Sequence, residues 1–300
     1  MRPTLRQLQY FVAVADTKRF GEAANRLNVS QPSLSAQISD MEGQLGTVLF
    51  ERGRQGALLT PKGEALLSRC RQILRDVEDL KAIALHEKDE LAGRLRLGIL
   101  PTIGPYLLPL ATRQLHRKYP DLRLIVREER TIDLEQHLHD GRFDAIISTS
   151  EDHKNVEDTF LFEEQLWICA ASDDELAKTT EPVSLEDLEG RSLLSLGYGH
   201  RLNLIIRSIA IRAGSYVNSE YEGTSLDAVR QMAEMGVGIG ILPSLYALTE
   251  ARRDPDLIIR PIDHDLARRR ISLIWRDSSP LSDSLSILGE EFRQAVGNVL

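Results

Sequence analysis

The segment from residue 31 to residue 45 constrains the fold of this chain more than any other. Its apolar residues recur at intervals of four, three and four, which is the spacing of a buried helical stripe. The opposite face carries small or amide side chains in place of the Lys and Glu that usually solvate a surface helix. We therefore expect a helix that packs on one side and contacts another molecule on the other. The stripe consists of Leu34, Ile38, Met41 and Leu45, and the open face of Gln31, Ser33, Ser35, Ala36, Gln37, Ser39 and Asp40.

Two shorter helices are predicted before this segment, over residues 5–17 and 20–27, because apolar residues fall on one side of each. Ala23 and Ala24 are small enough to let a crossing helix approach closely. The residues "NVS" then form a tight turn, after which Ser30 or Gln31 can cap the third helix and Pro32 fits its first turn. Two short helices, a turn and a third helix with an open polar face make a helix-turn-helix.

The open face of the third helix suits the major groove of DNA. A recognition helix places its N-terminal residues against base edges, where short Ser and Gln side chains can dock and exchange hydrogen bonds. The following stretch "TVLFERGRQGALLT" predicts two extended runs around a Gly- and Arg-rich tip, the shape of a wing. Arginines at such a tip suit contact with phosphates. The predicted DNA-binding residues are Gln31, Pro32, Ser33, Ser35, Ala36, Gln37, Arg52 and Arg54.

A long helix is predicted from Pro61 to about Glu90. Apolar residues recur along it at alternating steps of four and three, which is a heptad pattern. The helix packs either on its own head or against a second copy in a two-stranded coiled coil, and its length and polar flanks favour the coiled coil. A dimer would hold two heads at a fixed separation, which suits an inverted repeat in DNA. The predicted dimerisation residues are Leu66, Cys70, Ile73, Val77 and Leu80.

The charge of the chain is unevenly distributed. The first 75 residues carry 11 Lys and Arg against 6 Asp and Glu, a net charge of +5, while the remainder carries 26 against 39, a net charge of -13. A basic head on an acidic body indicates a polyanion as the partner of the head. No run approaches the ~18 apolar residues of a membrane span, and the N-terminus lacks a signal-peptide core. We therefore expect a cytoplasmic protein without membrane contact.

The two cysteines, Cys70 and Cys169, belong to no C-x-x-C pair. Neither a structural zinc site nor thioredoxin-like chemistry is supported, and we expect no metal and no cofactor. Both cysteines lie among apolar residues and are interpreted as buried small hydrophobic side chains.

The stretch that runs from "LRQLQYF" through "AANRLNVSQPSLSAQI" to "LLTPKGEAL" closely resembles the N-terminal head of LysR-type transcriptional regulators. The resemblance extends over the whole chain. It implies a winged helix-turn-helix domain at residues 1–60, a linker helix for dimerisation at 61–91 and an effector-binding domain at 92–300. It also implies a homodimer or homotetramer, a double-stranded DNA operator, contact with RNA polymerase, and ligand-dependent control of transcription, commonly activation.

Beyond residue 92 strands and helices alternate, which predicts an α/β architecture with largely parallel sheets covered on both faces. The resemblance makes this the two-lobed fold of periplasmic solute-binding proteins. The chain is expected to leave the first lobe through "TSEDHKNVEDTF" and to form strands of the second at "QLWICA", "SLLSL", "VNSEY" and "GIGILP". Ligands of such sheets bind at the C-terminal ends of strands, near helix N-termini. The side chains predicted there, around one cleft for a small-molecule effector, are Thr102, Thr131, Ser148, His200, Arg201 and Thr224.

The second half of the chain, with "LLSLGYGHRL" and "RRISLIWRDSSPLS", is most similar to the peroxide-sensing OxyR branch of the family. In that branch a peroxide-reactive cysteine follows the Gly-His pair, and its disulfide partner lies nine residues further on. Here these positions hold Arg201 and Ala210, so peroxide sensing through that disulfide is excluded. Arg201 is interpreted either as a clamp for an anionic effector, since a guanidinium binds carboxylate or phosphate bidentately, or as one partner of a structural salt bridge.

Three other functions compete with an effector-controlled regulator. A redox-responsive regulator would use Cys169. A helix-turn-helix fused to an enzyme is disfavoured, because the sequence contains no G-x-S-x-G, no P-loop and no paired zinc ligands. An architectural DNA-binding protein would leave the two-lobed body without a role. We therefore expect a regulator and no enzymatic activity.

Overall fold

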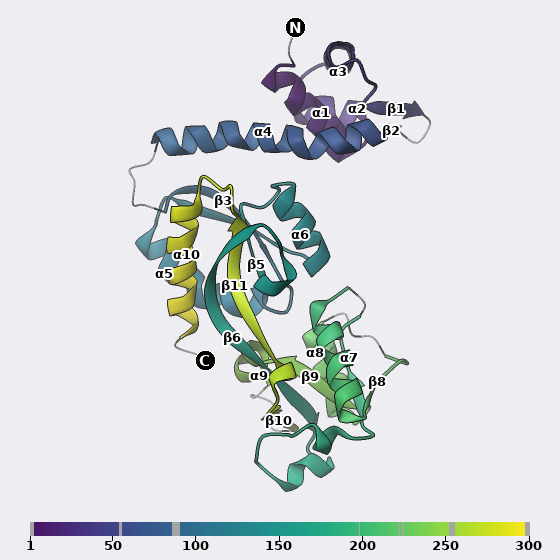
Figure 1. Ribbon diagram of the computed structural model, residues 1–300, viewed down its shortest axis with the longest axis vertical. Coiled ribbons are helices and arrows are strands. Elements are labelled where there is room, and N and C mark those ends of the chain that lie inside the picture. The colour runs from purple at the N-terminus through teal and green to yellow at the C-terminus, as the bar shows by residue number, and fades with distance from the viewer. Residues whose placement is uncertain are drawn as a thin grey trace. The chain divides into compact units, whose positions relative to one another are not determined.

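The computed structural model describes residues 3–53, 56–85, 91–197, 199–221, 223, 225–251 and 256–297 (Figure 1). Contacts divide the chain into two compact units, residues 1–88 with 139–142 and residues 89–138 with 143–300. Arg54 and Thr224 lie outside the described residues, as does the side chain of Arg52. In the described ranges, no helix is both long and apolar enough to span a membrane.

The N-terminal unit begins with α1 (Leu5–Thr17), α2 (Phe20–Arg26) and α3 (Gln31–Leu45). A capping box starts α1, in which the N–H of Gln7 donates to the Thr4 hydroxyl at 3.2 Å and the N–H of Thr4 donates to the Gln7 side chain at 2.9 Å. Ser30 caps α3, since its hydroxyl accepts from the N–H of Ser33 at 3.4 Å, and Pro32 lies in the first turn. The predicted helix-turn-helix is confirmed.

The apolar faces of these helices meet in a core of their own. Phe11, Leu34 and Ile38 are fully buried in it, and the small Ala23 is fully buried where α2 contacts its neighbours. Leu45, the last residue of α3, is exposed, so the buried stripe of this helix ends before it, at Met41.

A wing follows, made of the antiparallel strands β1 (Phe50–Gly53) and β2 (Gly56–Leu59). Phe50 anchors it to the helices, because its ring centroid lies 5.4 Å from that of Phe11 and 5.8 Å from that of Phe20. Gly56 has a φ of +106°, and a Cβ there would lie 2.5 Å from the carbonyl oxygen of Lys18. Glycine alone fits this position. The predicted wing is confirmed.

The long helix α4 (Pro61–Leu85) packs partly on its own head. Leu66 and Cys70 contact the core of the helix-turn-helix, as one of the two arrangements expected for this helix requires. Further along, the exposed fraction is 38% for Ile73 and 67% for Leu80. The dimerisation prediction therefore now depends on Ile73, Val77 and Leu80.

The second unit has two lobes, each with its own core. In the first lobe, parallel strands lie in the order β4-β3-β5, and the C-terminal helix α10 packs against α5 (Figure 1). The core is formed mainly by Leu, Ile and Phe side chains from both faces of these strands and from the helices. The elements are β3 (Gly93–Ile99), α5 (Gly104–Lys118), β4 (Leu122–Glu128), α6 (Thr131–His139), β5 (Ala145–Thr149) and α10 (Ser282–Val296).

In the second lobe, β7 pairs in parallel with both β8 and β9. The strand predicted over residues 217–221 was largely wrong, since β8 ends at Val217. The Asn218 side chain then accepts from the N–H groups of Glu220 and Tyr221 at 2.9 and 3.0 Å and turns the chain. The elements are β7 (Ser192–Leu194), α7 (Arg201–Ala213), β8 (Tyr216–Val217), α8 (Leu226–Glu234), β9 (Ile239–Pro243), α9 (Ser244–Thr249) and β10 (Leu257–Pro261).

Two long strands, β6 (Val156–Ala171) and β11 (Arg268–Arg276), connect the lobes and run antiparallel to each other. On β6, Leu161 belongs to the first core and Leu166 to the second. The connection predicted over residues 149–160 was therefore wrong beyond Asn155, where β6 begins. The sheet is mixed, not largely parallel, because β6 and β11 also pair antiparallel with β9 and β5. The spacing of apolar residues does not indicate whether neighbouring strands run parallel or antiparallel, which is why the prediction failed. The two-lobed α/β architecture itself is confirmed.

Candidate functional site

The first turns of α3 form the candidate DNA interface. The buried side of the helix holds Leu34 and Ile38 in the core, so the remaining side chains of these turns face away from it. Short polar groups thus occupy the open side, as a helix that enters a groove requires. Gln31, Pro32, Ser33 and Ala36 are exposed, and Ser35 and Gln37 are partly buried.

In the second unit, four of the predicted effector residues follow the C-terminal ends of parallel strands. Thr102 comes after β3, and Thr131 is the first residue of α6 after β4. In the second lobe, His200 and Arg201 come after β7, where α7 begins. Because each lobe places these ends at one edge of its strands, side chains from both lobes can meet there.

Thr102 is buried against an ion pair that lies where β6 and β11 pass between the lobes. Arg269 donates from Nη2 to the Thr102 hydroxyl at 3.3 Å and from Nε to Glu164 Oε2 at 2.6 Å. The Glu164 side chain is fully buried, and that of Arg269 is 3% exposed. Burial raises the pKa of Glu164, and the Arg269 guanidinium opposes that shift. Because a guanidinium has no acceptor atom, Thr102 must accept, and its own O–H remains available to donate.

Arg201 forms an ion pair that joins the two lobes. Its Nε lies 3.0 Å from Oδ1 of Asp152, which ends the short helix Ser150–Asp152 directly after β5 of the first lobe. The exposed fraction of the side chain is 37% for Arg201 and 11% for Asp152. Burial raises the pKa of Asp152 despite the opposing effect of Arg201. Of the two interpretations of Arg201, the salt bridge is present in the structure, and anion binding stays a prediction.

The loop before Arg201 approaches the first lobe. Gly199 has a φ of +96°, and a Cβ there would lie 3.3 Å from the Arg130 side chain. Burial, together with the nearby Arg130, lowers the pKa of His200, so its imidazole is neutral at neutral pH. The adjacent Thr131 hydroxyl is buried without a hydrogen bond to any described group. The loop with Gly199 and His200 thus lies beside Arg130 of the first lobe, the residue that precedes Thr131.

Ser148 lies inside β5 and not beyond its end, which corrects its predicted place. It is fully buried, and its hydroxyl oxygen lies 3.1 Å from Nε2 of His153. Its neighbour across the ladder is Ser272 of β11, which is also fully buried. β5 continues past Ser148 to Thr149. Asp152, in the short helix that follows, therefore lies beyond the end of the strand, where Ser148 was expected.

Two family profiles cover most of the chain. Residues 5–64 match "Bacterial regulatory helix-turn-helix protein, lysR family", and residues 88–297 match "LysR substrate binding domain". The chain belongs to the LysR family. It is a DNA-binding transcriptional regulator whose second unit is an effector domain.

Other LysR-family proteins match over nearly the whole length. The hydrogen peroxide-inducible genes activator of Dickeya chrysanthemi is 35% identical over 97% of this chain and 95% of its own. The transcriptional regulator EstR of Acinetobacter baylyi is 30% identical over 95% of each. A full-length OxyR variant from Pseudomonas aeruginosa has a TM-score of 0.79 at 30% identity, over 97% of this chain and 98% of that one. The predicted similarity to the OxyR branch is confirmed.

Both cysteines of this LysR-family chain are buried and free of disulfides. Burial raises the pKa of Cys169, which lies in β6, to about 12, and that of Cys70 to about 11. The thiolate is the reactive form of cysteine, so neither side chain is activated. Their interpretation as buried small hydrophobic residues is confirmed.

Sequence reasoning missed three charged residues of the site. Asp152 fell in a segment interpreted as a connection. Glu164 and Arg269 are 105 residues apart in the chain and become partners only through the β6–β11 ladder. A weak signal was present, since Glu164 alternates with the apolar Phe162 and Leu166, and a Glu on the buried face of a strand needs a partner.

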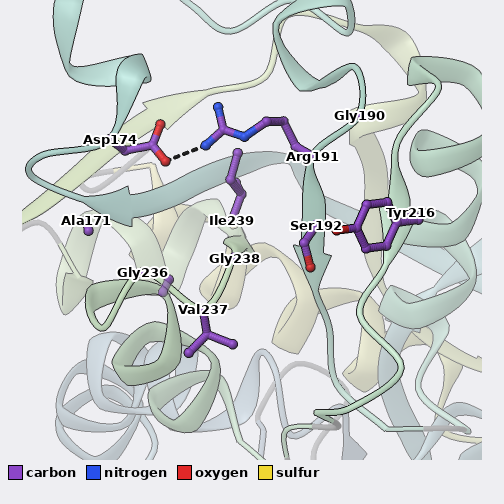
Figure 2. Close-up of a pocket in the computed structure, with 11 residues that line it drawn as sticks. Ala171, Asp174, Gly190, Arg191, Ser192, Tyr216, Gly236, Val237, Gly238 and Ile239 are labelled. Carbon is purple, nitrogen blue, oxygen red and sulfur yellow. Dashed lines mark hydrogen bonds and ion pairs between the residues drawn. The ribbon is translucent and has the colours of Figure 1, made fainter.

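A separate cavity of about 270 Å³ opens in the second lobe (Figure 2). Ser192 and Ile239, the first residues of β7 and β9, line it, so it lies at the opposite ends of these strands from Arg201. Asp174 and Arg191 in its wall pair with each other. The described lining includes none of the predicted effector residues.

Proposed function

We propose that a small carboxylate, bound between the lobes of the effector domain, controls this regulator. The ion pair between Arg201 and Asp152 carries the proposal. At the position where the OxyR branch has its reactive cysteine, this chain has a guanidinium that already contacts a carboxylate. Guanidinium groups match carboxylates in shape and charge, and such charge-assisted hydrogen bonds are about twice as strong as neutral ones.

Hydrogen-bond donors near Arg201 support the same ligand chemistry. The Thr102 O–H is available, because its oxygen already accepts from Arg269. The buried Thr131 hydroxyl lacks a described partner, and the neutral His200 imidazole can donate through one nitrogen. These three groups and Arg201 are the proposed effector-binding residues.

At the other end of the chain, α3 is proposed to read an operator with inverted symmetry. The dimer would form through the linker helix at residues 61–91, between a DNA-binding domain at 1–60 and an effector domain at 92–300. The name of the Dickeya chrysanthemi relative supports activation of transcription, and hence contact with RNA polymerase. We also propose assembly into a tetramer, which LysR-family membership supports, and a cytoplasmic location. We propose no catalytic role, because the matched relatives are regulators.

A reporter gene under the native promoter tests the effector proposal. We expect the wild-type protein to respond to one or more members of a library of small carboxylates, and not to the matching neutral amides. Arg201→Ala should need at least about tenfold more effector, the scale of a lost charge-assisted hydrogen bond. Arg191→Ala is the matched control, since Arg191 also pairs with an Asp but lies at the other end of the lobe. An unaltered response in Arg201→Ala refutes the proposal.

The redox alternative has weaker support. Cys169 is fully buried, its pKa is raised to about 12, and it packs so closely on Gly240 that a Cβ there would lie 2.5 Å from its sulfur. A sensor cysteine needs thiolate character and access to the oxidant.

A further inference from the structure

We propose that Asp152 is an internal occupant of the carboxylate site, and that an effector binds Arg201 by displacing it. The inference rests on the proposed function and adds its regulation. Asp152 belongs to the first lobe and Arg201 to the second, so their ion pair is a latch across the interlobe junction. Displacement transfers Arg201 from a partner in the opposite lobe to the ligand.

The latch is incompletely bonded on both sides. Arg201 Nε lies 3.0 Å from Asp152 Oδ1, but its N–H makes no hydrogen bond to any described group. Asp152 Oδ2 is likewise buried without a described hydrogen-bond partner. The contact is therefore a Coulombic one with unsatisfied polar atoms, and each such atom costs free energy when buried. A ligand carboxylate that is free to orient can make the hydrogen bonds that Asp152 does not make.

The surroundings of Asp152 also favour release. Burial raises its pKa more than Arg201 lowers it, so the ionised carboxylate is held in a site that disfavours it. Arg269, the other nearby guanidinium, lowers the pKa of Asp152 less than Arg201 does and is already bonded to Glu164 and Thr102. Arg201 keeps 37% of its side chain exposed, which gives a ligand access from solvent.

The neighbouring ion pair shows what a permanent link looks like. Arg269 donates from Nε to Glu164 Oε2 at 2.6 Å, and both side chains are almost completely buried, although Glu164 Oε1 also lacks a described hydrogen-bond partner. That pair lies within the two strands that connect the lobes, whereas the latch lies at the ends of β5 and β7. A ligand that binds one arrangement of the lobes better than another shifts their population. Of the two ion pairs, only the latch has a guanidinium that solvent reaches, because the Arg201 side chain is 37% exposed and that of Arg269 is 3% exposed.

Succinate serves as the probe, with succinamide as its neutral control, in calorimetric titrations of the full-length protein. Asp152→Asn removes the competing charge while keeping the side-chain shape, so we expect it to bind succinate about tenfold more tightly than wild type. Arg201→Ala should abolish that binding in either background. Glu163→Gln is the matched control, since it also removes one negative charge from an ion pair, with Arg268, but in an exposed place. It should leave the affinity unchanged.

The outcomes separate the two proposals. Equal succinate affinity in wild type and Asp152→Asn, with loss in Arg201→Ala, overturns the latch and leaves the carboxylate site standing. Binding that persists in Arg201→Ala overturns the carboxylate site itself. An Asp152→Asn protein that is folded by circular dichroism but binds no succinate also overturns the latch, because a released guanidinium must take a carboxylate. A gain of the same size in Glu163→Gln would make the effect one of overall charge and overturn it too.

Discussion

Arg269 holds the Thr102 hydroxyl through a hydrogen bond of 3.3 Å from its Nη2. The same guanidinium pairs with Glu164, so one residue of β11 contacts both a hydroxyl of the proposed effector site and a buried carboxylate. Arg269 thus stabilises the junction of the lobes. It also makes the Thr102 oxygen the acceptor of a hydrogen bond, so that the Thr102 O–H is left to donate.

Arg269→Ala should lower the free energy of unfolding by about 3–5 kcal/mol, because it leaves the Glu164 carboxylate buried without a partner. Urea unfolding of the full-length protein at neutral pH measures this loss. Arg268→Ala is the control on the adjacent residue, whose ion pair with Glu163 is exposed, and it should change little. Similar losses in the two variants would contradict the burial argument.

The pKa of Asp152 predicts a pH dependence of stability. The charged groups that act on it are Arg201, Arg269, Glu151 and Glu135, and burial outweighs the two arginines and raises the pKa. The folded protein therefore holds this proton more tightly than the unfolded chain, so Asp152 contributes stability at acid pH that is lost as pH rises through the folded pKa. Asp152→Asn removes this loss.

Unfolding experiments from pH 4 to pH 7.5 test the sign. The free energy of unfolding of Asp152→Asn, relative to wild type, should increase with pH over this range. A difference that stays constant, or that decreases with pH, would show that the pKa of Asp152 is not raised. Asp133→Asn, which removes a carboxylate from the exposed pair with Arg130, is the control for the substitution itself.

The exposed start of α3 predicts which substitutions affect sequence recognition. Gln31→Ala should weaken binding to the native operator by about 1–3 kcal/mol, the scale of a lost base contact, and should leave binding to random DNA nearly unchanged. Ser39→Ala, two turns further along the same helix, should have a smaller effect, because N-terminal residues lie nearest the bases. Fluorescence anisotropy on both DNAs distinguishes the outcomes, and equal losses on both would reassign Gln31 to backbone contact.

The partly exposed seam of α4 predicts how the dimer can be broken without unfolding the head. Ile73→Asp with Leu80→Asp adds charge only where the side chains are exposed, so the variant should sediment as a folded monomer and lose tight operator binding. Leu74→Asp is the contrasting variant, since Leu74 packs on the core of the head and its replacement should unfold that unit. Intact dimers in the double variant would show that α4 does not join protomers.

Local signals predicted the head well, and long-range pairing limited the prediction of the body. The cap at Ser30, the buried Ala23 and the wing around Phe50 all depend on residues near in sequence or on helical spacing. By contrast, β6 pairs with β11 more than 100 residues away, so its continuation through Val156 leaves no trace in a local pattern. The expectation that ligands bind at the C-terminal ends of strands located Thr102 and Arg201. It missed their charged partners, because the position of a strand end does not predict which side chains face it from another strand or lobe.

Peroxide should leave the DNA footprint of the wild-type protein unchanged. Oxidation begins from a thiolate, and the buried Cys169 and Cys70 have pKa values raised to about 12 and about 11, so almost no thiolate is present at neutral pH. Mass spectrometry after peroxide treatment should find both side chains as free thiols, and Cys169→Ser should have the same footprint as wild type. Arg201→Cys, which restores a thiol at an accessible position, is the positive control and should be oxidised in the same experiment. A wild-type footprint that shifts with peroxide, and no longer shifts in Cys169→Ser, would contradict this prediction. It would mean that the second lobe opens far enough for Cys169, now buried against Gly240, to ionise.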